Sequence, residues 1–161
     1  AILENCGRYR WEMCRKIQGV RWNDLREHSL TSDYYDYLQF YRKNRELSAE
    51  TKDQIKGALS RAKNNFREVF VKDYQNWIKY EAKGGFRLNR YVRQIMFTYC
   101  PFAKLYRADL RGNPMFADSI SRFETNNARS YKRLQGLYQK YKREGGEMTP
   151  ELRENLNFYQ M

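Results

Sequence analysis

The sequence contains few of the residues on which catalytic sites, metal sites and bound cofactors depend. His28 is the only histidine in 161 residues. A metal site built from imidazoles needs more than one of them, and a nucleophilic serine or cysteine would have this single ring as its base. The phosphate-binding motifs G-x-x-x-x-G-K-S/T and G-x-G-x-x-G do not occur. We therefore expect no catalytic residue, no metal, no cofactor and no enzymatic activity.

Cysteine is also scarce, which argues against a disulfide framework. Cys6, Cys14 and Cys100 are an odd number of thiols, and no two of them form the C-x-x-C pair of zinc sites and redox motifs. We expect all three to be reduced, and we favour buried thiols over a reactive or bridging one.

Long apolar stretches are missing as well. The longest run without a charged residue, 94–103, is interrupted by Pro101 and is far shorter than the roughly twenty apolar residues of a membrane-spanning helix. We expect no transmembrane segment. The compartment stays open between a reducing cell interior, a virion and an organelle matrix.

Few β-branched residues are present, and the apolar residues recur at helical spacing, which together predict an all-α fold. Aromatic residues are abundant instead, with 14 Tyr, 9 Phe and 3 Trp. We predict an irregular bundle of about five to seven helices, two of them long, at about 48–83 and 114–143. Ser48 and Asn113-Pro114 are suited to start these two helices. Shorter helices are expected near 3–18, 33–45, 88–100, 105–110 and 150–159, with Asp33 as the N-cap of the second.

The length of the chain fits one helical domain. We therefore assign residues 1–161 to a single domain. The first helix, within residues 1–19, is expected either as part of this bundle or as an arm that extends from it.

The positive charge is concentrated in two parts of the sequence. Lys and Arg number 31 against 19 Asp and Glu, a net charge of +12. The window 83–111 holds seven cations and one acid, and the window 129–143 holds six cations and no acid, so +6 and +6 account for the whole surplus. A charge that served only solubility would be spread more evenly, so this pattern favours a surface that binds a polyanion.

Arginines and tyrosines alternate within both windows, a mixture that suits contact with nucleic acid. Guanidinium groups bind phosphates, and aromatic rings stack on bases, although most of these tyrosines also suit a helical core. No residue pattern identifies a base-reading helix, so we expect contact with the phosphate backbone alone. The candidate nucleic-acid-binding residues are Arg87, Arg90, Arg93, Lys104, Arg107, Arg111, Arg129, Lys132, Arg133 and Lys140.

One short motif resembles the signature of a known family. Leu105-Tyr106-Arg107, followed by Leu110, Arg111 and Phe116, is similar to the motif of the LYR-motif mitochondrial accessory proteins. That resemblance covers about a dozen residues and implies a subunit or assembly factor of a respiratory complex. The triplet lies near the start of those proteins, whereas here about a hundred residues precede it. In its general character, and without a shared motif, the chain also resembles the basic all-helical coat proteins of filamentous virions.

We therefore predict a non-enzymatic protein that binds nucleic-acid backbone without sequence specificity, as a packaging, coat or assembly component. The alternative is a structural or accessory subunit of a larger complex, such as an organellar respiratory or ribosomal assembly. In that case the cations would contact an acidic protein surface. Under both hypotheses we expect association with other subunits or with copies of the same chain.

Overall fold

The chain is mainly helical in the part described by its computed structural model, residues 1–18 and 28–160. These residues form eight α-helices and no strand, which confirms the predicted all-α class and is close to the predicted number of helices. None of these helices is long and apolar enough to cross a membrane. The chain divides into two compact units, Ala1–Pro101 (unit 1) and Phe102–Met161 (unit 2). The single-domain organisation stays a prediction.

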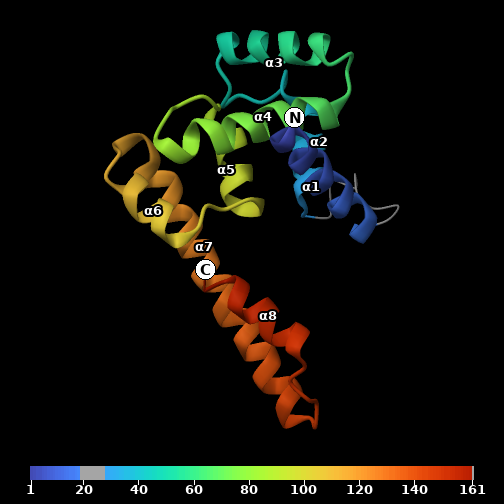
Figure 1. Cartoon of the computed structure of the whole chain (residues 1–161), viewed down its shortest axis with the longest axis vertical. Helices are drawn as coiled ribbons and strands as arrows, with labels where there is room; N and C mark the ends of the chain where they lie inside the picture. Colours follow the sequence, from blue (N-terminus) through green and yellow to red (C-terminus); the bar gives the residue numbers. More distant parts are fainter. Residues whose placement is uncertain (19–27, 161) are drawn as a thin grey trace. The chain divides into compact units, whose positions relative to one another are not determined.

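Unit 1 is built around one central helix. This helix, α4, packs against the other four helices of the unit and against a short 3-10 turn, η2 (Figure 1). In chain order, the elements are α1 (Ile2–Gln18), α2 (Leu30–Phe40), α3 (Ala49–Arg61), α4 (Phe66–Lys79), η2 (Glu81–Lys83) and α5 (Arg90–Tyr99).

Short polar side chains start four of these helices. Ser48, Asn65 and Asn89 each accept a hydrogen bond from a backbone amide in the first turn of α3, α4 and α5. Such N-caps satisfy amides that have no partner within the helix. The expectation that Asp33 caps the second helix is wrong, because Ser29 caps α2 in a reciprocal capping box with Ser32.

The prediction of one long helix at 48–83 is wrong. The chain leaves the helical path after α3 because Lys63 and Asn64 adopt positive φ angles of 51° and 58°. Asparagine tolerates this left-handed conformation better than most residues. Asn65 then caps the new helix α4. Two helices, α3 and α4, and the turn η2 therefore take the place of the one predicted helix. Only one side of α3 contacts the core.

Aromatic rings form the core of unit 1. Phe70 on α4 lies 5.4 Å from the Trp11 ring and 5.3 Å from the Tyr34 ring, and Trp77 lies 4.8 Å from Phe97. Trp11 on α1 is only 3% exposed, and α1 packs along α4. The first helix is therefore part of the core and not an arm.

The three cysteines lie in unit 1 and form no disulfide. Cys6 is exposed, and Cys14 and Cys100 are partly buried. The expectation that all three thiols are buried is therefore wrong, because α1 turns Cys6 to its outer face.

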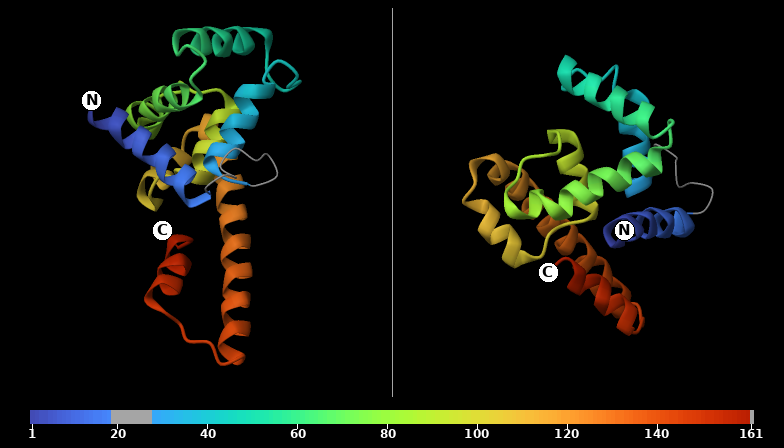
Figure 2. Two further views of the ribbon diagram at one scale, coloured as in Figure 1. Left: turned by 90° about the vertical axis from the view of Figure 1, so that its right-hand side faces the viewer. Right: turned by 45° about the horizontal axis from the view of Figure 1, so that its top comes forward.

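Unit 2 consists of a short helix, a long helix and a terminal helix: α6 (Lys104–Arg111), α7 (Pro114–Arg143) and α8 (Pro150–Phe158). The bounds of α7 confirm the predicted helix at 114–143, with Asn113 as N-cap and Pro114 in the first turn. The chain turns back at Gly145, whose φ of 89° suits glycine, and Thr149 then caps α8. Figure 2 shows α8 running back beside the second half of α7.

Candidate nucleic-acid interface

The two halves of the first basic window belong to different units. Arg87, Arg90 and Arg93 lie in unit 1, whereas Lys104, Arg107 and Arg111 lie in unit 2. The structure therefore does not bring this window together within one compact unit.

Arg93 is a core residue and not a surface cation. Its side chain is 1% exposed, and its Nε lies 2.7 Å from Oε2 of Glu81, which is fully buried. The guanidinium also donates to the Leu88 carbonyl and lies 3.6 Å from the centre of the Phe86 ring. The prediction that Arg93 projects with its neighbours toward nucleic acid is wrong, because Arg93 forms an ion pair with a carboxylate that is itself buried.

Glu81 organises the whole segment before α5. Its Oε1 accepts hydrogen bonds from the backbone amides of Arg87, at 2.7 Å, and Leu88, at 2.6 Å, in addition to the contact with Arg93. Sequence reasoning missed this residue. One signal was present, because Glu81 is the only acid in residues 74–108. An isolated acid in a basic stretch indicates a local partner.

Arg107 is likewise buried. Only 7% of its side chain is exposed, and the guanidinium donates to the Phe102 carbonyl and lies 5.0 Å from the centre of the Phe123 ring. Glu124 on α7 lies 3.7 Å from its Nε and also pairs with the exposed Arg111. Arg107 therefore fastens α6 to α7, so its assignment to a nucleic-acid surface is wrong.

The remaining cations of the first window are exposed but scattered. Arg87 lies outside any helix, with its guanidinium 5.1 Å from the centre of the Tyr80 ring. Arg90 lies at the start of α5, and Lys104 at the start of α6. The three-residue spacing of Arg87, Arg90 and Arg93 predicts a shared helical side, but only the last two are helical.

The second window, by contrast, places five of its six cations on one side of a single helix. All of its cations lie on α7 and are exposed. At 100° per residue, five of them fall within an arc of about 100°, and Lys142 lies outside it. We call these five the α7 cationic face: Arg129, Lys132, Arg133, Lys140 and Arg143.

Gly136 lies at the centre of this face. A Cβ added there would meet no atom within 4 Å, so the helix backbone is open to solvent between the cations. The only ion pair of the face among the described residues joins Lys140 Nζ to Glu144 at 3.8 Å, and both side chains are well exposed. Such exposed pairs are weak and leave the cation available to another anion.

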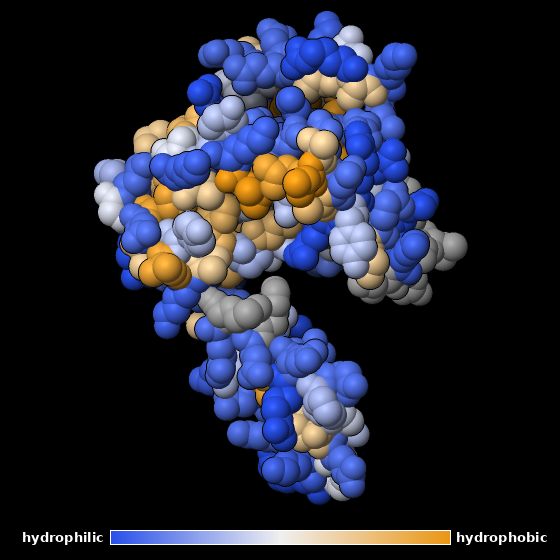
Figure 3. Space-filling model, in the orientation of Figure 1, coloured by the Kyte–Doolittle hydropathy of each residue, from blue (hydrophilic) through white to orange (hydrophobic). Residues whose placement is uncertain are grey.

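The opposite side of α7 contacts α8. Asn127 Nδ2 donates to the Tyr159 carbonyl at 2.6 Å, and Gln160 Nε2 donates to the Tyr131 hydroxyl at 2.8 Å. On the helical wheel, Asn127 and Tyr131 lie about 180° from the centre of the cationic face. The face therefore points away from α8. In the view of Figure 3, hydrophilic residues cover most of the surface of α7 and α8.

The described chain is thus an all-α protein that presents one cationic helix face. Residues 19–159 match the model of the family described as a domain of unknown function, DUF8509. Because this match spans most of the 161 residues, the chain belongs to that family. No curated protein and no solved structure matches the chain.

Proposed function

We propose that this protein binds the phosphate backbone of nucleic acid through the α7 cationic face, without sequence specificity and without catalysis. The observation that supports the proposal is the alignment of five exposed cations on the side of α7 opposite α8. We infer a packaging, coat or assembly role, because backbone binding neutralises charge without selecting a sequence.

The dimensions of the face suit a polyanion. Residues 129–143 span about 21 Å of helix at 1.5 Å per residue. Double-stranded DNA carries about one phosphate per 1.7 Å of its axis, so a stretch of this length offers more phosphates than the face has cations. Five phosphate contacts give a slope of log affinity against log salt of roughly −4.5.

The test is a comparison of two variants with equal net charge. In the first variant, four cations of the face are neutralised: Arg129→Gln, Lys132→Gln, Arg133→Gln and Lys140→Gln. The control neutralises four exposed lysines of unit 1: Lys43→Gln, Lys56→Gln, Lys72→Gln and Lys79→Gln. Binding to random-sequence duplex DNA and to single-stranded RNA is measured by fluorescence anisotropy over a salt series.

We expect the face variant to lose about 3 to 4 units of the salt slope, at about 0.9 per phosphate contact on duplex DNA. The control should keep most of it. Equal losses in both variants would show that only the net charge matters. Affinity that does not depend on salt would contradict backbone binding altogether.

A second function is supported by a different observation on unit 2. Leu105 and Tyr106, at the start of α6, are 72% and 54% exposed. Adjacent exposed apolar side chains occur at protein interfaces, where tyrosine is a frequent anchor. They favour the alternative that the chain is a subunit of a larger complex. In that case the isolated protein should self-associate in sedimentation experiments, and Leu105→Asn with Tyr106→Asn should reduce this association. A monodisperse wild-type monomer would contradict it.

A further inference from the structure

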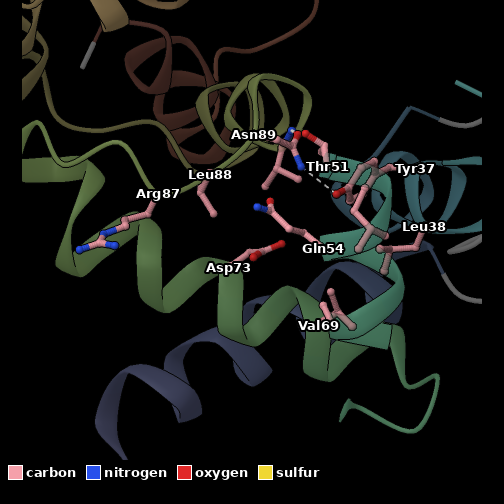
Figure 4. Close-up of a pocket in the computed structure, with 12 residues that line it drawn as sticks. Tyr37, Leu38, Thr51, Gln54, Val69, Asp73, Arg87, Leu88 and Asn89 are labelled. Atoms are coloured by element: carbon pink, nitrogen blue, oxygen red, sulfur yellow. Dashed lines mark hydrogen bonds between the residues drawn. The ribbon is translucent and has the colours of Figure 1, made fainter. Parts of the chain in front are cut away.

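A small cavity lies within unit 1, between α2, α3, α4 and the start of α5 (Figure 4). Its volume is about 100 Å³. Apolar and polar side chains share its walls, and one carboxylate, that of Asp73 on α4, lines it. The apolar wall residues are Leu38, Ile55, Ala58, Val69, Leu88 and Val92.

Asp73 has only part of its hydrogen-bonding capacity satisfied. The Tyr34 hydroxyl donates to its Oδ2, and no other described residue donates to this carboxylate. An ionised carboxylate can accept about four hydrogen bonds. Burial raises the pKa of Asp73 to about 6, so the group is still ionised at neutral pH. One carboxylate oxygen is therefore available to a ligand.

The groups around Asp73 leave its negative charge unpaired. Burial raises the pKa of both Tyr34 and Tyr37 on α2, so both rings are neutral. Gln54 of α3 and Asn89 are uncharged, and Asn89 Nδ2 donates to the Tyr37 hydroxyl at 2.9 Å. Arg87 lines the cavity, but its guanidinium points away from Asp73 and lies beside the Tyr80 ring (Figure 4).

This combination defines the ligand by its chemistry. A concave site that combines apolar walls with polar groups and an ionised group without a counter-ion is suited to a small organic ligand of opposite charge. A partly buried carboxylate is stabilised by a cation that also donates hydrogen bonds. A cavity of about 150 Å³ holds benzene, so this one suits about four non-hydrogen atoms. We propose that the cavity binds a small primary amine, with its ammonium group on Asp73 and its alkyl chain between α3 and α5.

The test uses n-propylammonium as the probe and 1-propanol as its uncharged match. The full chain is labelled in its Ile, Leu and Val methyl groups, and binding is followed by NMR at pH 7.5. We expect propylammonium to shift the wall methyl signals saturably in the millimolar range that so small a ligand reaches. Propanol should bind at least tenfold more weakly. Propanol binding as tightly as propylammonium, or no saturable shift, would overturn the proposal.

Two variants separate the site from the general charge of the protein. Asp73→Asn keeps an acceptor for Tyr34 and should weaken binding at least tenfold, whereas Asp53→Asn, at an exposed position on α3, should change it less than twofold. Ala58→Leu fills the cavity without touching Asp73 and should also abolish binding. Unchanged affinity in both Asp73→Asn and Ala58→Leu would refute the site.

The pH dependence gives an independent readout. At pH 5, protonation of Asp73 should weaken binding by about tenfold, while the probe keeps its charge. Affinity that is equal at pH 7.5 and pH 5 would show that the carboxylate does not bind the amine.

Discussion

The buried pair of Glu81 and Arg93 gives the sharpest prediction about stability. In Arg93→Met, the methionine fills part of the arginine volume, but Glu81 is left in a fully buried position without its charged partner. Removal of one member of a buried ion pair costs about 3–5 kcal/mol, because the remaining charge is uncompensated. Glu81 keeps its two backbone amide donors, Arg87 and Leu88, so we expect the lower end of this range.

The assay is urea unfolding followed by tryptophan fluorescence. All three tryptophans lie before residue 102, so the signal reports on unit 1. Arg90→Met, at an exposed position on the same helix, is the matched control and should cost under about 1 kcal/mol. Equal losses in Arg93→Met and Arg90→Met would refute the reasoning, because the buried pair would then contribute nothing beyond a surface arginine.

Three further predictions concern other parts of the molecule. Trp11→Ala should lower the free energy of unfolding of unit 1 by about 3–5 kcal/mol, since α1 is part of the core; a loss under 1 kcal/mol in urea unfolding would contradict this. Gly136→Ala should stabilise α7 by about 1 kcal/mol in thermal unfolding followed by circular dichroism, because the new methyl group meets open space; a destabilised helix would contradict this. The pKa of Asp73 is raised to about 6 from 3.8, so the free energy of unfolding of wild type should fall by up to about 3 kcal/mol relative to that of Asp73→Asn as pH rises from 4 to 7. A difference in unfolding free energy that stays constant over this range would contradict this.

The helices with strong end signals could be predicted from the sequence. Asn113-Pro114 begins α7 and Thr149-Pro150 begins α8 where capping rules place them. The break after α3 could not be predicted, because Lys63 and Asn64 include neither glycine nor proline. Their backbone is held in the turn by hydrogen bonds from the amide of Asn64 to the carbonyl of Leu59 and from the amide of Asn65 to that of Ala62.

The candidate site could be predicted only where it depends on local spacing. The cations of α7 share a face because helical periodicity alone determines their direction. Sequence spacing alone places Arg93 and Arg107 on the surface, because their partners are distant in sequence: Glu81 lies twelve residues from Arg93, and Glu124 lies seventeen from Arg107. Burial of an arginine depends on such a partner, and sequence spacing does not reveal the pairing.

The most direct test of the central claim maps the lysines that bound nucleic acid protects. The protein is treated with an acetylating reagent, with and without saturating RNA at low salt, and modification of each lysine is measured by mass spectrometry. Lys132 and Lys140 of the α7 cationic face should become several-fold less reactive, whereas Lys56 and Lys72 of unit 1 should not change. Equal protection of all four lysines, or none at Lys132 and Lys140, would contradict the proposal that this face binds nucleic acid.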